Sequence, residues 1–248
     1  MNKPLTLIGL WILLSITPIN AQSTTGTRGL VKAPTARMFE DGTLSLGAAL
    51  IPPGYYKRTF GSKQGDVVPN AGLNTFVTVN LFPFMEVMFR YSHELNLPVT
   101  PITQYFPDRM FTARFKLLNE TEKWPAVILG MQDVTAAFDA SCLGCSNFSS
   151  TYLVASKSLN FKKFSLDASL GYGGGLGDVV AREFVGLFGG IEITTPYLED
   201  TQLLIDYDAT YINLGVQKQF FKKLHTMISY YPNYQKVGWV VAYRYKMY

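Results

Sequence analysis

Charged side chains of both signs recur in segments where apolar and polar residues alternate. Side chains of one parity project to the same side of a strand. Eight charged residues share the polar parity of their segments: Glu86, Arg90, Arg114, Lys116, Asp167, Glu192, Asp206 and Asp208. If the strands close into a barrel with the apolar side outward, these charges meet in the lumen. There they would form an ion-pair network that stiffens the wall, or a polar path that contacts a saccharide.

Two pairs among these eight residues stand two positions apart on their segments. Arg114 and Lys116 form a basic pair, and Asp206 and Asp208 form an acidic pair. Each pair projects to one side of its strand. We therefore expect the two pairs to face each other across a narrow lumen.

Nucleophilic catalysis needs a serine within hydrogen-bond reach of a histidine. The candidates are Ser92 beside His93, and Ser229 four positions after His225. His225 and Ser229 share parity, so both are expected in the lumen, but four positions along a strand separate them by about 13 Å. We expect polar lumen residues rather than a catalytic pair, and hence no catalytic residue and no enzyme.

The two cysteines, Cys142 and Cys145, lie close together in a polar segment. This spacing resembles half of a zinc site or a redox pair. A metal would need two more ligands, and the chain has only His93 and His225 to add. For an exported protein a small disulfide that tightens a loop is the better interpretation. We expect no metal and no cofactor.

The elements that would position these residues are β-strands, because apolar residues recur with period two in runs bounded by Gly, Pro, Asn, Asp and Ser. No segment of ten residues convincingly predicts a helix. The expected strands number about twelve and cover residues 43–50, 74–82, 85–92, 110–118, 126–132, 151–159, 164–172, 187–195, 202–208, 212–220, 224–231 and 236–247.

Three features favour an outer-membrane barrel over a soluble sandwich. The expected strands approach the roughly 9 to 11 residues that cross a bilayer at a tilt. The connections alternate between long and short up to residues 196–200, as in barrels with short periplasmic turns and longer external loops. Aromatic residues gather at strand ends, as interfacial girdles do: Phe82, Phe84, Phe164, Tyr172, Phe220, Phe221, Tyr230, Tyr231, Tyr243 and Tyr245. The fold class is therefore all-β, an antiparallel transmembrane β-barrel of the outer-membrane type; Tyr248 is out of phase with the last strand.

Residues 1–21 have a short basic start, an apolar core and a small residue before Gln22, which predicts a cleaved signal peptide. No cysteine follows the apolar core, so a lipoprotein anchor is not expected. Residues 22–42 contain Pro34 and the turn pair Asp41 and Gly42, which predicts an irregular periplasmic lead-in that tucks into the barrel. The barrel itself is expected over residues 43–248.

The composition is 48% hydrophobic and 16% charged, with a formal net charge of +4. The acidic and basic residues are interspersed, and no Lys/Arg cluster marks a nucleic-acid surface. The expected partner is the lipid bilayer, and nucleic acid is excluded.

The stretch from Gly29 to Gly47, GLVKAPTARMFEDGTLSLG, resembles the opening signature of the YjbH family of outer-membrane proteins found with exopolysaccharide and capsule genes. The signature positions are Gly29, Pro34, Thr35, Arg37, Asp41 and Gly42. Later segments resemble the family in the same order: residues 82–91, 108–118, 152–157 and 188–196, so the resemblance spans about residues 29–220. The chain is much shorter than the long family members, and its last hairpins carry no recognised family motif.

The resemblance implies an outer-membrane location and a role in producing or exporting an exopolysaccharide or capsule. It also implies a polysaccharide and other envelope proteins of the same system as partners. Two alternatives remain open from the residues alone: an outer-membrane enzyme that acts on lipid or glycan, and a structural envelope protein.

Overall fold

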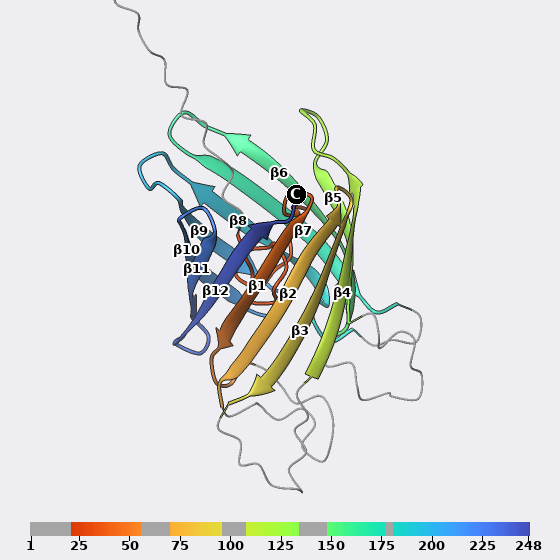
Figure 1. Ribbon diagram of the computed structural model, residues 1–248, viewed down its shortest axis with the longest axis vertical. Helices are drawn as coiled ribbons and strands as arrows, with labels where there is room; N and C mark the ends of the chain where they lie inside the picture. The colour runs from red at the N-terminus through yellow and green to blue at the C-terminus, as the bar shows by residue number, and fades with distance from the viewer. Residues whose placement is uncertain (1–20, 56–69, 96–107, 134–147, 177–180) are drawn as a thin grey trace, which may run out of the picture.

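The computed structural model describes residues 21–55, 70–95, 108–133, 148–176 and 181–248. Within these ranges the chain forms twelve strands, as the sequence predicts (Figure 1). Their bounds are β1 (Thr43–Ile51), β2 (Gly72–Phe82), β3 (Met85–Glu94), β4 (Asp108–Leu118), β5 (Ala126–Gln132), β6 (Ser150–Asn160), β7 (Ser165–Gly174), β8 (Gly186–Thr194), β9 (Thr201–Tyr207), β10 (Ile212–Phe220), β11 (Leu224–Tyr231) and β12 (Lys236–Lys246). No helix among the described residues is long and apolar enough to span a membrane.

The strands form one closed antiparallel barrel, in which each strand pairs with its neighbours in sequence. The ring closes between the first and last strands, from Thr43 opposite Lys246 to Leu50 opposite Trp239. Closure leaves no strand edge unpaired, which removes the main route to edge-to-edge aggregation. We call the rim with the connections 83–84, 119–125, 161–164, 195–200 and 221–223 the turn end, and the opposite rim the loop end.

The outer surface of the barrel is apolar and the inner surface is largely polar. On β9, Leu203, Ile205 and Tyr207 are exposed, whereas Gln202 and Asp206 are buried. Soluble barrels bury their apolar parity, so this inverted pattern is that of a membrane barrel. The predicted strand-end aromatics are exposed with one exception. Tyr231 was wrongly assigned: it follows the outward-facing Tyr230, so it points into the lumen and packs edge-on against Tyr55, with ring centroids 4.8 Å apart.

Glycines in the wall make room for aromatic rings inside the lumen. Gly130 stands opposite Tyr152 in register, and a Cβ at Gly130 would lie 2.1 Å from that ring. Gly171 and Phe188 form a second such pair, and Gly47 and Phe76 form a third. The missing side chain of each glycine lets the ring of its cross-strand neighbour lie flat along the wall. These pairs fill the periphery of the lumen and leave its centre for another segment.

Candidate functional site

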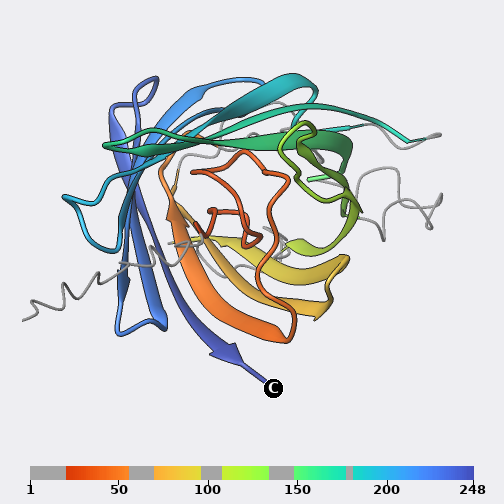
Figure 2. The same ribbon diagram turned by 90° about the horizontal axis from the view of Figure 1, so that it is seen from above.

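The centre of the lumen is filled by the segment from residue 21 to residue 42, which we call the plug. Figure 2 shows it coiled inside the ring of strands. Nearly all of its residues are buried, and Leu30, Val31 and Ala33 are completely so. The segment expected to tuck into the barrel therefore lies within it. The predicted signal peptide falls almost entirely on residues 1–20, outside the described residues.

The plug has a compact backbone of its own but no strand. Isolated bridges join Gln22 to Arg28 and Gly29 to Pro34. Gly26 has a φ of 102°, which favours glycine, and a Cβ there would lie 2.7 Å from the ring of Phe76. Gly29 approaches the carbonyl of Ala33 closely enough that a Cβ would lie 2.8 Å from it. Two of the glycines thus allow the plug to fold tightly enough to fit.

Hydroxyl and amide side chains of the wall bind the plug backbone directly. Thr78 Oγ1 donates to the Gly26 carbonyl at 2.6 Å, and Asn74 Nδ2 donates to the Thr24 carbonyl at 3.0 Å. On the opposite side, Ala36 N–H donates to Ser156 Oγ at 2.7 Å. A buried irregular segment has many backbone groups to satisfy, and the polar lumen satisfies them.

Arg114 joins the wall to the plug at mid-height. Its Nη1 lies 2.7 Å from Glu86 Oε1, on the adjacent strand, and both side chains are fully buried. The same guanidinium donates to the carbonyls of Arg28 at 2.9 Å, Arg37 at 3.0 Å and Thr35. A guanidinium has five donors in a fixed plane, so one side chain can bind a carboxylate and several carbonyls at once.

The acidic pair binds the tip of the plug at the loop end. Asp206 Oδ2 accepts from the backbone N–H of Lys32 at 2.7 Å and of Ala33 at 2.8 Å. Lys32 Nζ lies 3.4 Å from Asp208 and 3.2 Å from Glu183. Burial alone would raise the pKa of Asp208, but the charge of Lys32 and hydrogen bonds, including one from Tyr55, lower that pKa below its ordinary value. The carboxylate is thus held in its charged form against the plug.

The expectation that the basic and acidic pairs meet is wrong. No hydrogen bond or ion pair joins Arg114 or Lys116 to Asp206 or Asp208 in the described chain. The reason is steric: the plug lies between them, and each pair uses it as the nearer partner. Lys116 is half-buried on the wall, with no ion pair among the described residues.

Arg37 anchors the other end of the plug, near the turn end. It contacts Glu120 at 2.6 Å, Asp167 at 2.8 Å and Ser158 Oγ at 2.7 Å. Burial alone would lower the pKa of Arg37, but the charges of Asp167 and Glu120 raise it overall. Burial likewise opposes ionisation of Glu120, but a hydrogen bond from Ser158 and the charge of Arg37 lower its pKa. Glu192, also in the lumen, accepts from Gln202 at 2.5 Å.

Gln22 holds the plug to the closing seam of the barrel. Its Oε1 accepts from Ser45 on β1 at 2.9 Å and from Arg244 on β12 at 3.2 Å. Its backbone N–H donates to Gln217 on β10 at 2.9 Å. Leu30 packs against Gly190 on β8, and Val31 packs against Gly215 on β10. A Cβ at either glycine would lie 2.7 Å from the plug side chain that it faces. We call these two positions the glycine seats of the plug.

The signature residues all belong to the plug or its exit. Thr35 and Arg37 contact Arg114 and the turn-end carboxylates, as described above. At the exit, Gly42 has a φ of 70° and lies against the ring of Tyr248, whose hydroxyl donates to Asp41 at 3.0 Å. Tyr248 lies beyond the end of β12 at Lys246, so it does not follow the alternation of that strand. Its side chain instead binds the exit of the plug.

The candidate nucleophiles are not arranged for catalysis. His225 and Ser229 are both buried on the lumen side of β11, as their parity predicts. Ser229 Oγ, however, donates to the hydroxyl of Tyr231 at 3.2 Å. Cys142 and Cys145 lie outside the described residues, so their predicted disulfide stays a prediction. Across the described ranges, no group of three or more His, Cys, Asp or Glu side chains could hold a metal.

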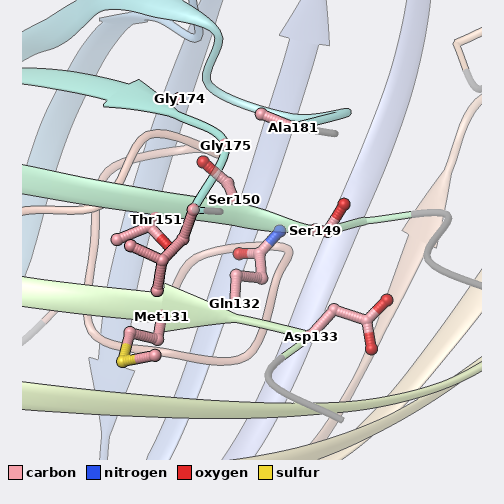
Figure 3. Close-up of a pocket in the computed structure, with 10 residues that line it drawn as sticks. Met131, Gln132, Asp133, Ser149, Ser150, Thr151, Gly174, Gly175 and Ala181 are labelled. Atoms are coloured by element: carbon pink, nitrogen blue, oxygen red, sulfur yellow. The ribbon is translucent and has the colours of Figure 1, made fainter. Parts of the chain in front are cut away.

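A small pocket opens at the loop end between β5, β6 and β7 (Figure 3). Gln132, Asp133, Ser149 and Ser150 supply its polar lining, and Gly174 and Gly175 border it. Gln132 Nε2 is already bound to the Phe148 carbonyl at 2.8 Å and to Glu183 at 2.5 Å. Glu183 also pairs with Lys32 of the plug, so Gln132 links the lining of this pocket to the plug.

Sequence reasoning missed several plug contacts. Gln22, Lys32 and Tyr55 each bind the wall or the acidic pair, yet none lies on an alternating segment, so parity says nothing of them. Only the position of Lys32 inside the Gly29–Gly47 stretch could have drawn attention to it.

Comparison with known proteins adds two findings. A family model described as "Exopolysaccharide biosynthesis protein YbjH" matches residues 21–184, from the start of the plug through β7; the resembling segment at residues 188–196 lies beyond this match. A protein of Escherichia coli strain K12 described as "Uncharacterized lipoprotein YjbH" is 26% identical over 239 residues. That alignment covers 82% of this chain but 30% of the relative, so the chain spans less than a third of its length.

Proposed function

Since the chain belongs to the YjbH family, we propose that it is an outer-membrane barrel that takes part in producing or exporting an extracellular polysaccharide. The observation that carries this proposal is a closed barrel with an apolar outer surface and a polar lumen occupied by the chain's own plug. Such a barrel offers a polymer one route across the lipid, through the lumen.

The way in which the plug is held supports a lumen that opens. Hydrogen bonds and ion pairs join the plug to the wall at the seam, at mid-height and at both ends of the barrel. Water or a saccharide hydroxyl can replace such contacts one by one, since both donate and accept hydrogen bonds. The plug also makes apolar contacts, since Leu30 and Val31 belong to one buried apolar cluster of the lumen and Ala33, Ala36 and Met38 belong to another.

A structural envelope role is the second candidate, and the filled lumen favours it. A barrel whose centre is occupied by a well-bonded segment can serve as an anchor for partners without passing anything. The third class, an enzyme acting on lipid or glycan, is disfavoured by the contact of Ser229 with Tyr231 in place of a base. We propose that the barrel has no catalytic role.

A disulfide that locks the plug to the wall tests the route. Ala36 N lies 2.7 Å from Ser156 Oγ, so the two residues are in contact, and Ala36→Cys with Ser156→Cys introduces a cysteine at each of them in an oxidising compartment. The variant replaces the native gene, and carbohydrate released into the medium is measured with and without a membrane-permeant reductant. If polymer passes through the lumen, the locked barrel releases little and the reductant restores release.

The two single-cysteine variants are the matched controls, because each carries one of the substitutions and neither can form the lock. Full polymer release from the locked barrel would contradict passage through this lumen and support the structural role. Unchanged polymer in a strain that lacks the gene would contradict a role in polymer production or export.

A further inference from the structure

Arg90 on β3 is a fully buried cation in apolar surroundings. Its cross-strand neighbours are Phe76 on β2 and Met110 on β4. Its guanidinium stacks over the ring of Phe148, with the central carbon 4.3 Å from the ring centroid. Within the described residues, none of its three guanidinium nitrogens has a hydrogen-bond acceptor, although the residue is 0% exposed.

The other buried arginines of the lumen differ from Arg90. Arg114 has Glu86 as its cross-strand neighbour and donates to three plug carbonyls, Arg37 binds two carboxylates, and Arg244 binds Gln22. Burying a charge without a partner is among the costliest arrangements in a protein, and a buried unsatisfied group in a native fold calls for an explanation. Stacking on Phe148 offsets part of this cost but leaves the in-plane donors unused.

The unused donors define what Arg90 can bind. A guanidinium stacked by one face presents its edges, and these match the two oxygens of a carboxylate or phosphate. Two more unused groups lie on the same inner surface: Ser92 Oγ, two residues along β3, and Thr112 Oγ1 on β4, neither with a partner in the described chain. A guanidinium, an aromatic ring and two hydroxyls together suit a sugar that carries an oxyanion.

The plug packs next to this part of the wall. Gly26 packs on the ring of Phe76, the cross-strand neighbour of Arg90. The seated plug thus occupies the lumen next to the site, and an anion reaches the site when the plug moves aside. Arg90 is a cation without a partner in the closed lumen and gains one in the occupied lumen.

We propose that Arg90 is a binding residue for an oxyanion, a carboxylate or phosphate group carried by the saccharide that enters the lumen. The inference rests on the proposed function for the saccharide and deepens it, because it specifies an acidic polymer. Arg90 thereby favours entry of acidic over neutral chains.

Binding to the purified full chain in detergent tests the site. The probes are a short oligogalacturonate, inorganic phosphate, and a neutral maltooligosaccharide of the same length, each titrated by calorimetry at constant ionic strength. We expect oligogalacturonate or phosphate to bind and the neutral chain not to bind. Arg90→Met should weaken that binding by about tenfold or more. Arg90→Lys keeps the charge but not the planar fork, so it should bind at an intermediate level.

Arg109→Met is the matched control, because Arg109 is an exposed residue on β4 beside Met110 and its loss changes the net charge equally. It should bind like the unmodified protein. Arg90→Met should also melt at the same or a higher temperature, since it removes an unpaired buried charge; a structural arginine would lower the melting temperature. Phosphate binding alone identifies a phosphate-bearing chain, and oligogalacturonate binding identifies a carboxylate.

Three results would overturn the proposal: neither anion binds, Arg90→Met binds as well as Arg109→Met, or Arg90→Met melts at a clearly lower temperature. The proposed function is tested separately, by polymer release from cells. Arg90-dependent binding in a protein whose loss leaves polymer unchanged would retain this site and reject the export role.

Discussion

Arg114 joins the wall to the plug through three backbone carbonyls, and its removal has a predictable cost. Arg114→Met leaves Glu86 charged and buried, and also frees three plug carbonyls. Breaking a buried ion pair from one side costs about 3 to 5 kcal/mol of unfolding free energy. We expect a loss of this order, measured by urea unfolding in detergent or lipid.

Adding Glu86→Gln to Arg114→Met should return part of the lost stability, because the second change removes the unpaired charge. Arg109→Met, on the outside of the same strand, should change stability little. Strictly additive effects of the two lumen changes would show that Arg114 and Glu86 do not depend on each other.

The charged state of the residues around the plug predicts a pH dependence. The pKa values of Asp208 and Glu120 lie below their ordinary values of 3.8 and 4.5 in the folded protein. Groups with lowered pKa stabilise the fold fully above their unfolded pKa and lose this contribution as the pH falls through the folded pKa. The contribution of these two carboxylates to seating of the plug should therefore be complete above about pH 5 and be lost as the pH falls below about 4.

Protease cleavage within the plug, followed as a function of pH, measures this loss. Asp208→Asn removes the ion pair with Lys32, so cleavage should already be faster at pH 7 and rise less on acidification. An unchanged acid profile in this variant would mean that Asp208 does not set the response.

At the scale of residues, the sequence predicted which side of its strand each charged side chain occupies, but not which groups that side chain binds. Parity alone placed Glu86, Arg90, Arg114 and Asp206 in the lumen, because a strand alternates its sides strictly. Their partners are backbone groups of an irregular segment, and no periodicity places such a segment. The basic and acidic pairs were therefore matched to each other instead of to the plug.

At the scale of elements, the fit between plug and wall rests on glycine seats. A Cβ at Gly215 would lie 2.7 Å from Val31 and no closer than 3.4 Å to its other neighbours, Leu204 and Met227. Gly215→Val should therefore push against the plug while leaving β10 in place, at a cost of about 1 to 3 kcal/mol to the closed state. In planar bilayers this variant should show more frequent open events.

Val31→Ala in the same chain should restore the closed state, because it returns the lost volume from the plug side. Gly130→Val is an informative comparison: its Cβ would meet the ring of Tyr152, a wall residue, so it should impair barrel folding rather than plug seating. Equal effects of Gly215→Val with and without Val31→Ala would argue against this seat.

The strands themselves were largely predictable. Expected and observed bounds agree within a few residues, and β1 begins at Thr43, where regular alternation begins. Long strands with one apolar side leave little freedom of register, because a shift of one residue turns every side chain over. Tyr231 is the exception: an aromatic residue at a strand end predicts an outward-facing ring, whereas its alternation with the exposed Tyr230 correctly predicts a ring in the lumen.

At the scale of the whole molecule, removal of the plug separates the wall from its contents. The wall has all its strand edges paired without the plug. A variant lacking residues 22–42 should therefore still form a barrel that migrates as a heat-modifiable band in outer-membrane fractions. It should conduct ions steadily in planar bilayers where the full chain is silent.

A deletion variant that folds but does not conduct would show that something other than the plug closes the lumen. Recovery of the full chain in the soluble periplasm would reject the membrane barrel altogether. The closed ring and its apolar outer surface follow from strand number, length and parity, whereas the state of the lumen depends on a segment with no pattern.

Gln22 has a consequence for the order of assembly. It binds Ser45 on the first strand and Arg244 on the last strand synthesised. These two strands come together only when the ring closes, so an unfinished barrel offers Gln22 only part of its binding site. The plug therefore gains all its contacts only after the last strand has paired with the first. Protection of the plug from protease is then a measure of whether the ring is complete.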